Sequence, residues 1–152
     1  MIARGTEISD RVIQALEAIT MAGGFHTDAG LRVTRGRAEL LQVEQTDLPM
    51  IAVSTSSSAN AAVKPRTVRK TRELEIIGLV DAADRDYEPE LDGLDEDIAL
   101  ALSGLTGIDE LPGTMNIEIS GGEYQPPAGG SNIAGVLHTV TVSYVLTTKP
   151  QP

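Results

Sequence analysis

The sequence predicts an α/β domain of the α+β kind, in which a mixed, mainly antiparallel β-sheet is flanked by two main helices in the order α-β-β-β-α-β-β. Apolar residues recur at helical spacing in two segments and alternate with polar residues in several others. The length of 152 residues is typical of one domain, and two separate cores would each be small. We therefore expect a single domain over residues 1–152, with long loops at about 54–70 and 121–133. The first of these segments, rich in Ser, Ala and Asn, suits either an exposed loop or a mobile hairpin arm.

Two segments have the spacing of amphipathic helices. In the first, from about Thr6 to Met21, the periodic apolar residues are Ile8, Val12, Ala15, Leu16 and Ile19. A pair of glycines at 23–24 is expected to end it. In the second, the periodic residues are Leu91, Leu94, Ile98, Leu102 and Leu105. Acidic residues fill its first turns, where the helix dipole favours negative charge, and Gly104 is expected to end it.

Alternation of apolar and polar residues predicts the strands. Leu31 and Val33 indicate a short strand. Residues 38–45 are ambiguous between strand and loop, and we interpret them as strand. The apolar run 50–53 suits a strand that is covered on both faces. Residues 73–82 have the clearest strand pattern, with Leu74, Ile76, Gly78 and Val80 on one face.

Two further strands are expected at about 115–119 and 134–148. One face of the last strand carries Val136, His138, Val140, Val142, Tyr144 and Leu146. Its opposite face carries Thr139, Thr141, Ser143 and Thr147. This second face is uncharged and rich in threonine, which suits contact with another subunit as well as with water.

Composition excludes several classes of function. A formal net charge of -10 opposes binding to phosphate backbones, so sequence-specific binding of nucleic acid is not expected. The absence of cysteine excludes disulfides, thiolate nucleophiles and cysteine zinc sites, and it fits a reducing cytosol. The charged N-terminal segment does not resemble a signal peptide, and no apolar run approaches the roughly 20 residues that span a bilayer. We expect a protein that is neither exported nor embedded in a membrane.

The sequence contains no pattern typical of a catalytic or cofactor site. No phosphate-binding G-x-x-x-x-G-K loop is present, and the glycine pairs at 121–122 and 129–130 are expected to form turns. His26 and His138 lie far apart without a nucleophile elbow, so His138 is expected to pack within its strand. We therefore expect no enzyme activity, no catalytic residue and no cofactor.

The acidic segment 84–92 places carboxylates at alternate positions, as a calcium-binding loop does. Two positions disagree with that loop. Pro89 stands where the loop needs glycine, and Asp95 stands where it needs a bidentate glutamate. The pattern favours a solvated acidic connection, and we expect no metal site, although weak cation binding stays an alternative.

Charge is strongly segregated along the chain. Five of the twelve basic residues are Lys64, Arg66, Arg69, Lys70 and Arg72, whereas residues 81–97 contain nine acidic residues. The basic run suits either a solvated loop or an arm that meets an acidic neighbour. A second copy of the chain offers such a neighbour through Asp84, Asp86 and Glu88, and a ring could close in this way.

Four segments of the chain resemble the tail terminator proteins of long-tailed bacteriophages, the group of the small minor tail protein that forms a ring at the head-proximal end of the tail. They are the helix ISDRVIQALEAI, the strand DLPMIAVST, the strand and helix LEIIGLVDAADRD and LDGLDEDIALALS, and the ending GGSNIAGVLHTVTVSYVLTT. The similarity extends over nearly the whole chain. It lies in the order of the elements and in their pattern of residue types, because none of these segments is a signature of catalysis.

The resemblance implies a structural virion protein, assembled in the host bacterial cytoplasm and located at the head-proximal end of the tail. Its implied partners are five identical copies in a hexameric ring, the tail tube protein whose polymerisation the ring stops, and a head-completion or neck protein. DNA would pass through the lumen without sequence-specific binding. The basic and acidic residues named above would then lie at a subunit or tail-tube interface.

Three other functions fit parts of the sequence. Another head-tail connector, neck or head-completion protein would share the small α/β fold and ring symmetry. A monomeric protein-binding module would use residues 64–72 to recognise an acidic protein. A divalent-cation hydrolase using Asp84, Asp86 and Glu88 is the least favoured reading.

Overall fold

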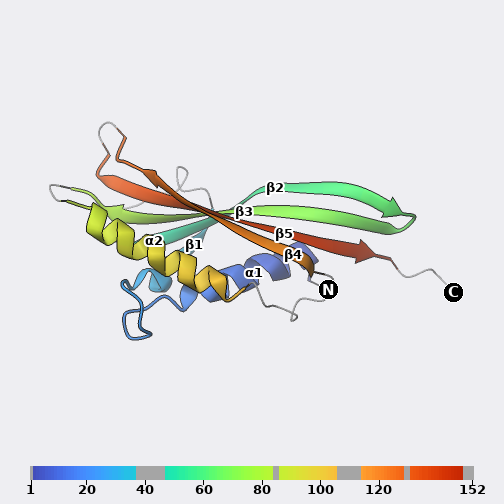
Figure 1. The fold of residues 1–152 in the computed structure, drawn as a ribbon, viewed down its shortest axis with the longest axis horizontal. Helices are drawn as coiled ribbons and strands as arrows, with labels where there is room; N and C mark the ends of the chain where they lie inside the picture. Colours follow the sequence, from blue (N-terminus) through green and yellow to red (C-terminus); the bar gives the residue numbers. More distant parts are fainter. Residues whose placement is uncertain (1, 37–46, 84–85, 106–113, 129–130, 149–152) are drawn as a thin grey trace.

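The computed structural model contains one five-stranded sheet with both main helices on the same face (Figure 1). It describes residues 2–36, 47–83, 86–105, 114–128 and 131–148. The elements are α1 (Arg4–Glu17), the 3-10 helix η1 (Ala29–Arg32), β1 (Val33–Arg35), β2 (Met50–Lys64), β3 (Thr67–Asp81), α2 (Glu88–Ser103), β4 (Thr114–Gln125) and β5 (Ile133–Thr147). This order confirms the predicted fold class.

The strands are arranged in the order β1-β2-β3-β5-β4. Only the short β1 runs parallel to its neighbour, pairing Val33 with Ile51, and every other pair is antiparallel. The central strand β3 is paired along its whole length with β5 and along nearly all of it with β2. Strand β4 therefore forms one edge of the sheet. On the other side, β1 covers β2 only over three residues, so the rest of β2 forms the second edge.

The core lies between this sheet and the two helices. The apolar stripes of α1 and α2 are buried against alternate residues of β3 and β5, as predicted. Gly78 in β3 allows α2 to approach closely, because a Cβ there would lie only 2.7 Å from Leu94 Cδ2 and 2.8 Å from Ile98 Cδ1. The predicted strand at 50–53 is also confirmed, and its residues are buried as expected for a strand covered on both faces.

Of the two interpretations of residues 54–70, the structure supports the hairpin arm and not the long loop. These residues continue β2 and begin β3, and they form a hairpin that extends beyond both helices (Figure 1). We call residues 55–71 the arm. The sequence shows no apolar alternation here, because the β2 residues of the arm are all exposed and the β3 residues are mostly polar, with only Thr67 buried.

Two shorter predictions also need correction. Residues 29–32 form the turn η1 rather than a strand, and Leu31 is exposed. Gly30 donates its N–H to the carbonyl of Ile19 at 2.8 Å, and a Cβ at Gly30 would lie 2.5 Å from that oxygen. This close approach holds the chain in a turn, and the strand begins only at Val33.

The loop expected at 121–133 is shorter than predicted, because β4 continues to Gln125. Gly121 and Gly122 form a bulge within β4 and have φ angles of 151° and 88°. Gly121 lies against the backbone of His138, where a Cβ would approach the His138 Cα to 2.5 Å. Helix α1 begins and ends earlier than predicted, at Arg4 and Glu17, and the strand interpreted at 38–45 lies outside the described residues.

Candidate functional site

The arm presents four basic side chains and no acidic one. They are Lys64, Arg66, Arg69 and Lys70. Arg66 lies in the turn that joins β2 to β3, with a φ of 64°, and its carbonyl accepts a hydrogen bond from Thr148 N at 3.0 Å. Within the described part of the chain, none of these four side chains forms an ion pair. Their charge is therefore available to another molecule.

Arg72, the fifth predicted interface residue, has a structural position instead. Its side chain points toward α1, where one guanidinium nitrogen donates to Ser9 Oγ at 3.1 Å and to Thr55 Oγ1 at 2.9 Å. The absence of a side chain at Gly5 gives the guanidinium room, because a Cβ there would lie 2.7 Å from Arg72 Nη1. Arg72 thus connects Thr55, the first residue of the arm, to Ser9 of α1, and it is not part of the exposed basic surface.

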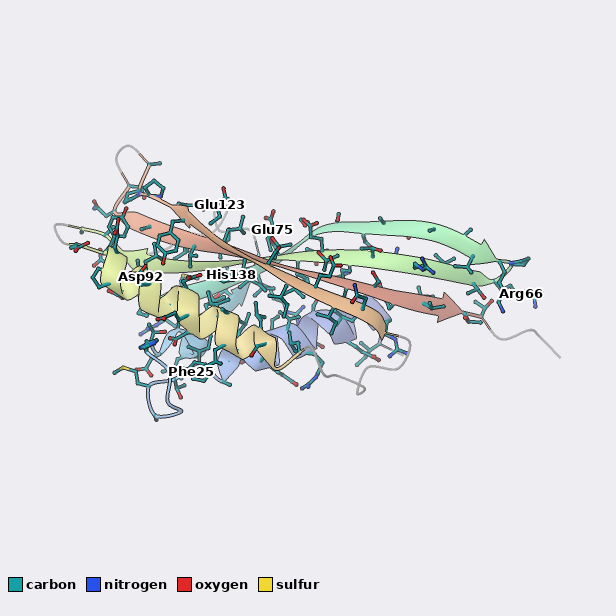
Figure 2. All side chains as sticks on the ribbon, viewed as in Figure 1. Phe25, Arg66, Glu75, Asp92, Glu123 and His138 are labelled. Atoms are coloured by element: carbon teal, nitrogen blue, oxygen red, sulfur yellow. The ribbon has the colours of Figure 1, made fainter. Side chains whose placement is uncertain are left out.

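The acidic residues lie at the other end of the molecule. Figure 2 shows Arg66 and Asp92 at opposite ends of the longest axis. Asp86 is exposed and accepts a hydrogen bond from Glu88 N at 3.2 Å, next to the first turn of α2, and Glu88 is exposed as well. Asp84 lies outside the described residues. One protomer does not bring the basic and acidic groups together, so they can meet only through a second chain.

Two acidic residues attach α2 to the sheet. Asp95 Oδ1 lies 2.8 Å from His138 Nε2, and His138 is buried, which confirms that it packs within its strand. Asp92 accepts a hydrogen bond from the Tyr124 hydroxyl of β4. Burial, the hydrogen bond to Asp92 and the nearby carboxylates together raise the pKa of Tyr124, because each disfavours the phenolate.

Asp97 is a buried carboxylate, although the sequence analysis identified it only as one of the acidic residues in 81–97. It is 2% exposed and accepts bonds from His26 N, Thr27 N and Thr27 Oγ1, all at 2.8–2.9 Å. These three donors satisfy the carboxylate without a cation. The signal was present in the sequence, since Asp97 lies three residues after Leu94 and next to Ile98, at the margin of the buried stripe.

The sheet face away from the helices bears four glutamates, and Arg69 of the arm lies farther along the same face of β3. The glutamates are Glu73, Glu75, Glu118 and Glu123. Glu73 and Glu118 flank Thr141 from the two neighbouring strands, and Glu75 is paired with Thr139. Figure 2 shows Glu75 and Glu123 on this side of the sheet and His138 toward the helices. The threonine-rich face of β5 is thus uncharged itself but bordered by carboxylates.

The described residues hold no cluster of metal ligands. They contain no group of three His, Asp or Glu side chains placed to hold a metal ion. A shallow cavity of about 230 Å³ lies between α1, β2 and β3 and is lined by Ser9, Arg72 and Leu74, among others. None of the helices in the described part of the chain is long and apolar enough to span a membrane.

The described residues form an α+β architecture in which both main helices lie on the same face of the sheet. Its fold resembles one chain of a solved structure described as the virion of a native gene transfer agent particle. The TM-score is 0.52 at 14% sequence identity, and the match covers 88% of this chain and 91% of the other. Neither protein-family models nor curated protein sequences match the chain. The shared property is therefore the fold over most of both chains.

Proposed function

We propose that this protein is a structural component of a phage-like virion and acts as its tail terminator. In this role a hexameric ring caps the tail tube, stops its polymerisation and joins the tail to the head. The observation that carries the proposal is the separation of charge along the longest axis, with the unpaired basic arm at one end and the acidic start of α2 at the other. The virion origin of the structure with a similar fold supports it.

Charged groups at opposite ends suit a subunit that has different partners above and below it. Complementary charge steers such partners into one orientation and rejects the reverse one. Copies related by a rotation would place all arms on one rim of a ring and all acidic ends on the other. We assign the arm rim to the tail tube and the acidic rim to the head-completion or neck protein.

The acidic face of the sheet supports the passage of DNA through such a ring. The carboxylates of Glu73, Glu75, Glu118 and Glu123 would repel phosphates if this face lined the lumen. A basic lumen would hold the DNA backbone through counterion release and slow its transit. The proposed role requires binding and assembly only, so we propose no catalysis.

The mass of the protein across concentration tests the ring directly. Light scattering behind gel filtration should give a species of about six protomers, and electron microscopy should show closed rings. At low salt, rings should also stack end to end through their opposite rims and separate at high salt, because exposed charge pairs are screened. A protein that is monomeric at every concentration and salt would contradict the ring and favour the monomeric binding module.

A charge reversal in the arm tests the assignment of the rims. Arg69→Glu should abolish stacking and leave the rings intact, and adding Glu88→Lys should restore part of the stacking. Arg32→Glu is the matched control, because Arg32 is an exposed arginine of η1 remote from the arm and the reversal changes net charge equally. Stacking that survives Arg69→Glu would overturn the assignment of the arm to a rim contact.

A further inference from the structure

The outer edge of β2 is unpaired along the arm. Strand β1 pairs with β2 only over Ile51–Val53, and Gly36 N donates to Val53 O at 2.8 Å just beyond that contact. From Ser54 to Lys64 no strand of the described residues lies on this side. Every second backbone N–H and C=O in this stretch therefore faces outward, available for pairing with another strand.

Between its two register shifts, this edge carries neither charge nor proline to oppose pairing. Native edge strands are blunted with lysine, proline or inward charges, yet no charged residue occurs between Leu48 and Val63. The side chains from Ser54 to Ala62 are Ser, Thr, Ala and Asn, which are small enough to allow close approach of another backbone. Register shifts at Thr55/Ser57 and Ala62/Lys64 leave a regular ladder between Ser57 and Ala62.

The opposite edge of the sheet is β4, and part of it lies level with the free edge of β2. Along one line across the strands, Ser57 pairs with Glu73, Glu73 with Thr141, and Thr141 with Glu118. The same counting places Asn60 level with Thr114 and Ser54 level with Ser120. Residues 54–60 and 114–120 thus lie at the same height, and no strand of the described residues covers their outer edges. Each segment contains one register shift, at Thr55/Ser57 and at Thr114/Asn116, and between these shifts and Asn60 or Ser120 the strands are regular.

The directions of the two edges also match. Three successive antiparallel pairings, from β2 through β3 and β5 to β4, make β2 and β4 run in opposite directions. A rotation about an axis along the strands preserves direction, so β4 of a rotated copy meets β2 in antiparallel orientation. The bulge at Gly121–Glu123 bends β4 away at the height where β1 already covers β2.

We infer that residues 54–60 of β2 pair as an antiparallel ladder with residues 114–120 of β4 in a second copy of this chain. The inference rests on the proposed ring and identifies the surfaces that close it. The two surfaces differ, so the contact is head to tail and can continue around a ring until it closes. Six joined sheets would then present their acidic faces to the lumen, while the arms project from one rim.

Cysteine cross-linking tests this contact, and the chain has no native cysteine to interfere. The double variant Ser57→Cys, Glu118→Cys should give, on oxidation, a ladder of covalent species ending at about six protomers, because paired strands bring Cα atoms within disulfide range. Replacing the second position by Asn116→Cys or Ser120→Cys covers registers shifted by two residues. Ser57→Cys with Ala99→Cys, on the exposed face of α2, should give no ladder.

An edge-blocking variant gives a second, non-covalent test. Ala59→Lys should raise the concentration needed for half-assembly by at least about tenfold, since a lysine on an edge strand opposes its pairing with another strand. Ala99→Lys, the same substitution at an exposed helix position, should change it less than about twofold.

The outcomes separate this inference from the proposed function. Wild-type rings with no cross-linked ladder in any register, or rings that tolerate Ala59→Lys, would overturn the edge contact and leave the ring standing. Rings that Arg69→Glu dissociates to monomers would mean that the arm closes the ring, again overturning the edge contact. Covalent dimers from Ser57→Cys alone would indicate β2 against β2 and overturn the assignment to β4. Absence of wild-type assembly would contradict both.

Discussion

The arm and the helix-covered half of the molecule are built from the same strands but held together differently. In the covered half, alternate residues of β3, such as Leu74 and Ile76, are buried under α1 and α2. In the arm, every residue of β2 from Thr55 to Lys64 is exposed. The covered half therefore carries the hydrophobic stabilisation, and the arm depends on its backbone ladder alone. The exposed side chains of the arm contribute little to folding, which leaves them available for the contacts proposed above.

The largest expected difference between the two regions comes from removing apolar side chains. Leu94→Ala, at a fully buried position of α2, should lower the free energy of unfolding by about 2–5 kcal/mol, through lost transfer energy and a residual cavity. Val63→Ala, at an arm position that is 54% exposed, should change it by less than about 0.5 kcal/mol. Urea unfolding followed by circular dichroism measures both, and equal effects would contradict the division.

The next expected effect concerns the buried polar contacts of the covered half. Asp97→Ala removes the acceptor of three hydrogen bonds from residues 26–27. It should lower the free energy of unfolding by about 1–3 kcal/mol, because buried donors are left without a partner. Glu96→Ala is the control, since this exposed neighbour contacts only His26 and should cost less than about 1 kcal/mol. The same unfolding assay applies, and a negligible loss for Asp97→Ala would show that the 26–27 turn is held by other contacts.

Packing between α2 and the sheet can be tested by adding one methyl group. Gly78→Ala should destabilise the protein by about 1–3 kcal/mol, because the new Cβ would press on Leu94 and Ile98. Gly104→Ala, at the end of α2, should be neutral or stabilising by up to about 1 kcal/mol, since its φ is -67° and the nearest atom to a Cβ is 3.5 Å away. Thermal unfolding of the pair checks this, and a harmless Gly78→Ala would mean that α2 can move away from the sheet.

The smallest effect is a pH dependence at the junction of α2 and β4. The folded state raises the pKa of Tyr124, so this group's contribution to stability is complete below its ordinary pKa of about 10 and is lost as pH rises through the folded value. Tyr124→Phe should therefore flatten the fall of stability above about pH 10. Tyr87→Phe should retain the wild-type fall, because it leaves the Tyr124 contact with Asp92 intact. Denaturant midpoints measured across alkaline pH distinguish the two.

Sequence reasoning located the core well and the exposed regions poorly. Periodic apolar residues predicted both helices and the buried face of β3 and β5 because burial imposes its period on the sequence. The same reasoning left the arm open between a loop and a hairpin, because exposed residues such as Ser58 and Ala61 impose no apolar period on the sequence. It also grouped Arg72 with the arm, although Ser9 and Thr55 fix it at the root.

The sequence by itself determined the order of elements, the buried faces and the segregation of charge, since these depend on residue type and local spacing. Only the tertiary structure decided which distant residues meet. It placed Asp95 against His138 and Asp92 against Tyr124, it set Arg66 and Asp92 at opposite ends, and it left the edges of β2 and β4 level and antiparallel. Strand register and sheet order set these relations, and both arise from contacts between segments far apart in the chain, which local patterns do not encode.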